Sequence, residues 1–169
     1  MEKRDFQKIA ITGTAAVLIP ILLSTSIVMS VFAAPTLHSP ITCSVISQNR
    51  LRCNLDVSGL GGATTATAKL TGTATVTTGC INQGSKNHEP QGLQRSTTTV
   101  TATQTVNVEG GRAIFTLTTQ PLSASQLRTC PDQMTPTIVC VTFSNISIQV
   151  IPNSGPSRTF PVSGTFSNC

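Results

Sequence analysis

Hydrophobic and polar residues alternate along most of the chain after residue 40. From residue 65 to residue 77, threonine stands at nearly every second position, with Ala, Leu or Val at most positions between. A period of two is typical of a β-strand with one buried and one solvated face. Threonine is β-branched and favours strands, and it keeps an exposed face soluble without charge. The pattern predicts an all-β protein with Thr-rich outer faces.

The alternation recurs between clusters of Gly, Pro and Asn, and helix signals are weak. We expect seven strands, at residues 41–47, 51–58, 64–78, 96–108, 113–119 and 137–151, and near the C-terminus at Phe160, Val162 and Phe166. Residues 120–136 form a long connection, in which we expect one helical turn at 123–128. Strands of this number and length favour an antiparallel, immunoglobulin-like β-sandwich; a small barrel is the alternative.

Residue parity predicts the pairing of neighbouring strands. A hairpin that turns at Gln48 sets Cys43 opposite Cys53, within disulfide reach. A second hairpin, turning at residues 109–112, sets Val106 opposite Phe115 on one apolar face.

The strand at 137–151 changes parity midway. Its apolar residues are odd as far as Phe143 and even from Ile146 onwards, which predicts a β-bulge near Ser144 and Asn145. A final hairpin follows from this bulge. Its predicted partners are Val150 with Phe160, Ile148 with Val162, Phe143 with Phe166 and Cys140 with Cys169.

Six cysteines stand at positions 43, 53, 80, 130, 140 and 169, and they allow fifteen disulfide connectivities. The two hairpin pairs leave Cys80 with Cys130, which joins the two longest loops. The Cys-x-x-Cys spacing of zinc sites does not occur. With an export signal, the pattern predicts three disulfides in an oxidising compartment.

The N-terminus begins with charged residues, and a largely apolar run of about 24 residues follows from Ile9 to Phe32. The small Ala33 at position −1 and the β-branched Val31 at position −3 fit signal-peptide cleavage after Ala33. We therefore expect a signal peptide at 1–33 and a secreted domain at 34–169. The alternative is a retained transmembrane helix over 9–32, the one contact with a membrane that the sequence suggests.

The expected mature domain carries eight basic and four acidic side chains, which gives a net charge of +4. These charges are scattered, and Trp and Tyr are absent. Nucleic-acid binding needs clustered basic residues with interleaved aromatic ones, so we expect no nucleic-acid partner.

Several segments carry a resemblance, in the order Gly59-Leu60-Gly61, Cys80-Ile81-Asn82, residues 111–119, Cys130-Pro131 and Val141-Thr142-Phe143. Over about residues 57–148 the chain resembles a group of uncharacterised prokaryotic secreted proteins with one Thr-rich, disulfide-containing β domain. The resemblance implies export, an all-β fold and pairing of Cys80 with Cys130, and it implies no catalytic activity. Many of those proteins place a Trp shortly after the Cys-Pro pair, where this chain has Met134.

Candidate chemistry is sparse. His88 and Glu89 lie in the loop that Cys80 would hold near Asp132, and the set suggests either a small metal or acid–base site or solvated loop residues. Together with Met134 they form the candidate interaction loop. No Gly-x-Ser-x-Gly motif occurs, and the spacing of the carboxylates suggests no glycosidase pair. Asn145-Ile146-Ser147 is a candidate N-glycosylation acceptor.

These observations favour an exported, non-enzymatic protein that serves as a structural or interaction module outside the cell or on its surface. We expect no cofactor and no metal, and a partner among surface or matrix components. A pilin-like filament subunit with a retained N-terminal helix is the first alternative. A secreted hydrolase or inhibitor is the second.

Overall fold

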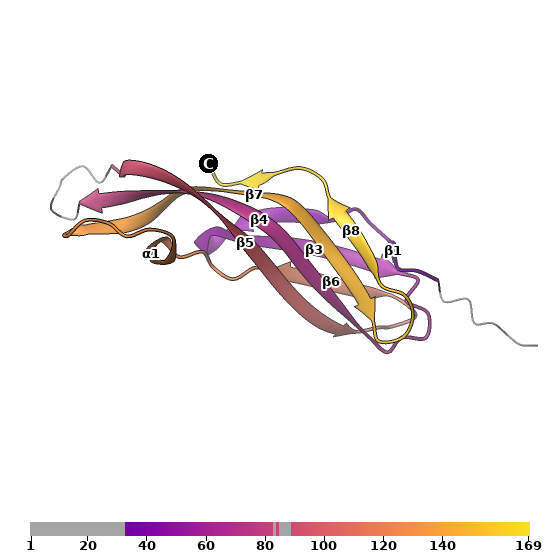
Figure 1. Ribbon diagram of the computed structural model, residues 1–169. Helices are drawn as coiled ribbons and strands as arrows, with labels where there is room; N and C mark the ends of the chain where they lie inside the picture. Colours follow the sequence, from indigo (N-terminus) through magenta and orange to yellow (C-terminus); the bar gives the residue numbers. More distant parts are fainter. Residues whose placement is uncertain (1–32, 83, 85–88) are drawn as a thin grey trace, which may run out of the picture. The chain divides into compact units, whose positions relative to one another are not determined.

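The computed structural model describes residues 33–82, 84 and 89–169, which belong to one compact unit. The expected signal peptide lies outside these residues, apart from Ala33. No helix in the described ranges is long and apolar enough to cross a membrane. The described chain is mostly antiparallel β-strand, as predicted, and a strand ladder joins most of its segments (Figure 1).

The strands number nine in the described residues, because a short N-terminal strand is added and the last predicted strand is divided. They are β1 (Thr36–Leu37), β2 (Thr42–Ile46), β3 (Arg50–Ser58), β4 (Thr65–Asn82), β5 (Gln91–Asn107), β6 (Ala113–Thr118), β7 (Met134–Pro152), β8 (Arg158–Val162) and β9 (Phe166–Ser167). A 3₁₀ turn, Ser47–Asn49, joins β2 to β3. The predicted helical turn is α1 (Ala124–Leu127).

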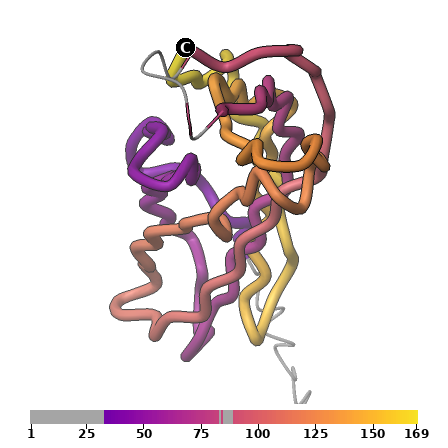
Figure 2. Tube along the Cα trace, turned by 90° about the vertical axis from the view of Figure 1, so that its left-hand side faces the viewer, coloured from indigo at the N-terminus to yellow at the C-terminus, as the bar shows by residue number. Residues whose placement is uncertain are grey.

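The strands form two sheets, which appear as two layers in Figure 2. In the first sheet β3 is central, with β1 and β2 on one side and β6 on the other. The second sheet has the order β5-β4-β7, and both β8 and β9 pair with β7. This arrangement buries one face of each sheet against the other.

The core lies between the two layers and consists of the apolar half of each alternating strand. Phe115 of β6 and Phe143 of β7 are fully buried, and Leu70 of β4 is nearly so. Burying an aliphatic or aromatic side chain of this size stabilises the fold by about 1.5–3 kcal/mol. The predicted alternation of buried and solvated positions is therefore confirmed.

Threonines pair across the outer face of the second sheet. Thr71 of β4 lies opposite Thr101 of β5, and Thr73 lies opposite Thr99. The ladder continues in both directions, and at one end the hydroxyls of Thr67 and Thr105 are hydrogen-bonded at 2.8 Å. Cross-strand Thr pairs contribute to sheet stability, so the threonine pattern has a structural cause without any ligand.

The first hairpin has the predicted register. Cys43 pairs with Cys53 and Val45 pairs with Leu51. The chain turns through Gln48 (φ 61°) and Asn49 (φ 53°), two residues in the left-handed region. Asparagine tolerates this conformation better than most residues, which suits it to the turn.

The predicted hairpin of residues 96–108 with residues 113–119 is wrong. The chain does turn where expected, with a bridge between Glu109 and Arg112. Beyond that bridge β5 joins β4 in the second sheet, and β6 joins β3 in the first, so Val106 does not face Phe115 across a ladder. One hydrogen bond still links the two strands, from the Thr116 backbone N–H to Oε1 of Gln104 at 2.8 Å.

The predicted bulge in β7 is confirmed. The register of β7 against β4 shifts by one residue between Ser147 and Ser144, and Asn145 has a φ of 51°. Phe143 pairs with Phe166, as predicted. The expected pairing nearer the turn is wrong by two residues, because the hairpin closes more tightly: Ile148 pairs with Phe160. An even shift keeps the same face buried, so the pattern of residues fits either register.

The three disulfides have the predicted pairing. Their Cα–Cα distances are 4.1 Å for Cys43–Cys53, 5.8 Å for Cys80–Cys130 and 4.8 Å for Cys140–Cys169. The described residues contain no free cysteine. Each disulfide closes a loop of the chain, so all three reduce the conformational freedom of the unfolded protein.

Candidate functional site

The predicted interaction loop lies at one end of the second sheet, where β4 ends and β5 and β7 begin (Figure 1). We call residues 78–82, 89–94 and 128–136 the tip. Here Gln91 of β5 pairs with Cys80 of β4, and Met134 of β7 pairs with Asn82 of β4. Strand pairing thus continues into segments that the sequence predicted to be loops, and part of the tip is β-strand.

Two cross-links hold the tip together. The disulfide Cys80–Cys130 joins the end of β4 to the segment that follows α1. The guanidinium of Arg128 donates to the carbonyl oxygens of Thr78, at 3.0 Å, and of Gly92. The disulfide and the hydrogen bonds together fix this segment against both β4 and β5.

Gly79 lets the chain before β5 pack closely on β4. A Cβ atom at this buried glycine would lie 2.5 Å from Cβ of Pro90 and 3.2 Å from Cδ2 of Leu93. The register of β4 shifts next to it, between Thr77 and Thr78 against β7, and between Thr78 and Cys80 against β5. Glycine is needed here because only a residue without a side chain admits Pro90.

The predicted site residues divide between the two flanks of β4. Glu89 precedes β5 and Asp132 precedes β7, and both are exposed. Met134 is half-buried at the start of β7, and His88 lies outside the described residues. Within the described ranges, no group of three His, Cys, Asp or Glu side chains could hold a metal ion. The tip also exposes Leu93, at 62% of its surface.

The candidate glycosylation residue Asn145 lies at the β7 bulge. It is exposed, and its side chain belongs to a strand whose register shifts at this point.

A second polar group, which was not among the predicted site residues, lies on the outer face of the first sheet. Arg112, which precedes β6, donates two hydrogen bonds to the carboxylate of Asp56 on β3, one of them at 2.8 Å. The hydrogen bonds from Arg112 lower the pKa of Asp56, and the nearby charges of Arg112 and His38 lower it further. The same hydrogen bonds raise the pKa of Arg112. Both side chains are therefore charged at neutral pH, and they form an ion pair.

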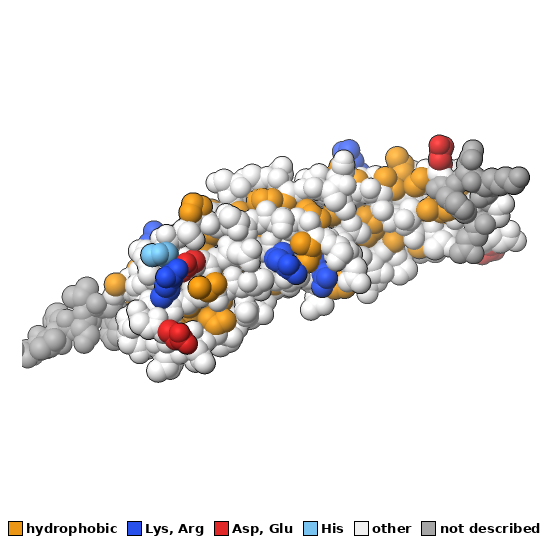
Figure 3. Space-filling view, turned by 180° about the vertical axis from the view of Figure 1, so that it is seen from behind, with side chains coloured by type: hydrophobic (Ala, Val, Ile, Leu, Met, Phe, Trp, Pro, Cys, Tyr) orange, Lys and Arg blue, Asp and Glu red, His pale blue; other side chains and the backbone are white. Residues whose placement is uncertain are grey.

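Ile114, on β6, is the most exposed large aliphatic residue of this face, at 63%. It pairs with Asp56 across the sheet. Shallow hollows of about 420 and 310 Å³ lie on its two sides, the first also lined by Arg112 and the second by Pro40. Figure 3 views the molecule from behind: a histidine lies beside basic and acidic side chains near one end, and hydrophobic atoms are scattered along the whole of a largely uncharged face.

Sequence reasoning had one available signal for this group. Ile114 occupies an outward position in a strand whose inward residues are Ala113, Phe115 and Leu117, so a large apolar residue stands where Thr is usual. Asp56 and Arg112 are far apart in the sequence, and only the pairing of β3 with β6 brings them together.

A comparison with known proteins finds no family model that matches this chain and no curated protein that matches its sequence.

Proposed function

We propose that this chain is an exported, non-enzymatic protein that acts outside the cell or on its surface as a structural or interaction module. The observation that carries the proposal is the set of three disulfides that join all six cysteines. Disulfides of this density persist in oxidising compartments and are rare in a reducing cytosol. The N-terminal apolar run supplies the matching route of export.

The proposed fold is an immunoglobulin-like sandwich. Its support is the division of strands between the sheets: β2, β3 and β6 on one side, and β5, β4, β7 and the last strands on the other. In immunoglobulin-like domains the chain likewise forms a first hairpin and then alternates between two sheets. Such sandwiches present loops at both ends and serve many proteins as rigid carriers of contact surfaces.

A role in contact, without catalysis, is supported by the chemistry of the surfaces. The outer face of the second sheet consists mainly of Thr and Ser. On the first sheet, the charges of Asp56 and Arg112 are already paired with each other. Catalysis requires placed acids, bases or nucleophiles that face a substrate. The exposed Ile114 and Leu93 instead offer apolar contacts at two separate places.

Labelling of intact cells tests the proposal. Lys69 is exposed on the Thr-rich face, so an amine reagent that cannot cross membranes should modify it in living cells of the source or in their medium. Crosslinking in the same cells should join the protein to surface or matrix material. Modification of Lys69 only after lysis would contradict export, and turnover in a broad hydrolase screen would contradict the non-enzymatic role.

A further inference from the structure

Strand β5 is an end strand of the second sheet. In the described part of the chain, β4 pairs with one edge of β5 and no strand pairs with the other. The Val108 N–H donates to the carbonyl of Thr64, opposite in register, at 2.9 Å. Because the direction of backbone groups alternates along an antiparallel strand, even residues of β5 point their N–H and C=O groups at β4. Odd residues, from Thr97 to Thr103, point theirs outward.

This edge lacks the features that normally prevent strands from pairing. From Ser96 to Asn107, β5 contains no charged residue, no proline and no shift of register. The opposite edge of the same sheet differs: β8 is five residues long and carries Arg158 and Pro161. Short length, charge and proline are the usual means of protecting an edge. One edge of the sheet is protected and the other is open.

Strand β6 lies beside the last residues of β5 without pairing with them. There the Thr116 N–H of β6 donates to the side chain of Gln104 of β5. That contact and the bridge of Glu109 with Arg112 confine the free part of β5 to the residues before Gln104. In that part Thr97, Thr99, Thr101 and Thr103 are all exposed. The free edge is thus long, regular and accessible.

We propose that this edge of β5 pairs with the same edge of a second copy of the chain. The pairing is antiparallel about a two-fold axis near Val100, with Thr99 opposite Thr101 of the second copy and Thr97 opposite Thr103 of the second copy. Odd residues then meet odd residues, so every outward N–H finds a carbonyl. A two-fold interface of this kind closes on itself and yields a dimer.

The chemistry of the strand favours a second copy as the occupant. The new Thr–Thr pairs repeat those that β5 already makes with β4, where Thr99 faces Thr73 and Thr101 faces Thr71. The one charged residue of β5, Arg95, would lie opposite Thr105 of the second copy, so like charges do not meet despite the net charge of +4 on the expected mature domain. Like charges directly opposite would oppose pairing.

This inference deepens the proposed function and rests on it, because it names one contact of the proposed interaction module. The test uses the exported, oxidised protein with the N-terminus that it carries in its host. Sedimentation velocity over a range of concentrations should show a monomer–dimer equilibrium. Residue-resolved amide exchange should show that Thr97, Thr99, Thr101 and Thr103 gain protection as the concentration rises. Even residues, already bonded to β4, should be protected throughout.

A matched pair of variants isolates the backbone contact. Thr101→Pro removes an outward N–H and no hydrogen bond to β4, and it should weaken dimerisation about tenfold or more, because two hydrogen bonds are lost across the symmetric interface. Thr101→Val keeps the N–H and should dimerise as the wild type does. A protein that stays monomeric, or whose odd amides exchange alike at all concentrations, would overturn the edge pairing even if cell labelling confirms export. The exchange measurement on the wild type decides the matter if the proline variant does not fold.

Discussion

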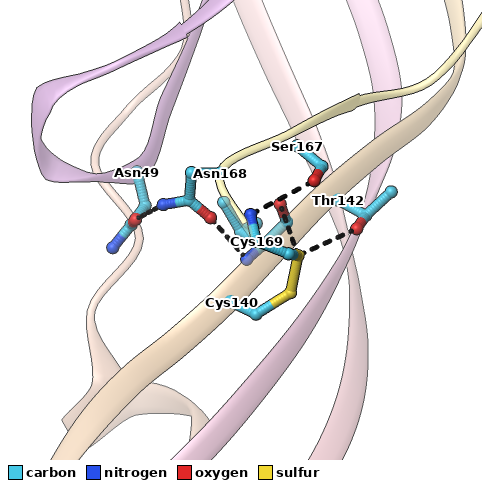
Figure 4. Close-up of a disulfide and its surroundings, with 7 residues drawn as sticks. Asn49, Cys140, Thr142, Ser167, Asn168 and Cys169 are labelled. Atoms are coloured by element: carbon cyan, nitrogen blue, oxygen red, sulfur yellow. Dashed lines mark hydrogen bonds between the residues drawn. A yellow bond between two sulfur atoms is a disulfide. The ribbon is translucent and has the colours of Figure 1, made fainter.

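Asn168 is joined to Asn49 by a hydrogen bond from its Nδ2 to the Oδ1 of Asn49, at 2.6 Å (Figure 4). Asn49 belongs to the turn between β2 and β3 of the first sheet, whereas Asn168 follows β9 of the second. Oδ1 of Asn168 also accepts from the backbone N–H of Val141 at 2.8 Å. One side chain thus links the two sheets next to the disulfide that ends the chain.

Replacing this side chain should destabilise the fold. Asn168→Ala leaves the buried N–H of Val141 without its side-chain acceptor and removes the bond to Asn49. We expect the free energy of unfolding to fall by about 1–3 kcal/mol, measured in urea under non-reducing conditions. Asn107→Ala, at an exposed position of β5, is the control and should change the free energy by about 0.5 kcal/mol or less. Equal losses in the two variants would refute the role of Asn168.

The three disulfides should differ in their contribution to stability in the order of their loop lengths. They close separations of 50, 29 and 10 residues, for Cys80–Cys130, Cys140–Cys169 and Cys43–Cys53 respectively. In the chain-entropy model, replacing each pair by serine should cost about 4, 3.5 and 2.7 kcal/mol. Chemical unfolding of the three double variants measures this order. If the Cys43–Cys53 variant loses the most stability, the entropy of the unfolded chain does not set the order.

Gly79→Ala should destabilise the tip, because the new Cβ would lie 2.5 Å from Cβ of Pro90. We expect a loss of about 1–3 kcal/mol, typical of overpacking. Gly62 is the matched control, since it has nothing within 4 Å of an added Cβ and does not have a positive φ. Gly62→Ala should stabilise the fold by about 0.4–1 kcal/mol through the unfolded state. Thermal unfolding of both variants compares them, and a neutral Gly79→Ala would show that Pro90 moves freely.

The ion pair of Asp56 with Arg112 should make stability depend on pH in acid. The hydrogen bonds from Arg112 hold the pKa of Asp56 below its unfolded value. Its contribution is therefore present above a pH of about 3.9 and is lost as the pH falls through the lower folded pKa. Asp56→Asn and Arg112→Gln should each flatten this part of the curve. Unfolding measured between about pH 2 and 6 tests it; unchanged curves in both variants would exclude the pair as the cause.

Local pairing could be predicted from the sequence because parity is preserved within a hairpin. The register of Cys43 with Cys53 and the bulge at Asn145 follow from the alternation of a few neighbouring residues. The separation of β5 from β6 could not be predicted in this way, since both strands keep the same alternation whether they pair or enter different sheets. The predicted partner of Phe160 was wrong by two residues for a similar reason, because a shift of two residues leaves the alternation unchanged.

The candidate sites show a similar division. The cross-link at the tip could be predicted from the sequence, because the pairing of Cys80 with Cys130 brings the two loops that contain them together. The pair of Asp56 with Arg112 depends on a contact between distant strands, and the sequence holds no local sign of it. The free edge of β5 likewise becomes visible only when the order of strands in the sheet is known.

The central claim is that this chain is an exported, disulfide-bonded module, and the mass of the intact protein from its native source tests it most directly. The protein is treated with a thiol-alkylating reagent before and after reduction. We predict a chain that begins at Ala34, takes up no reagent before reduction and takes up six equivalents after it, one for each cysteine. A cytosolic chain that still begins at Met1 and is alkylated at all six cysteines without reduction would contradict the account.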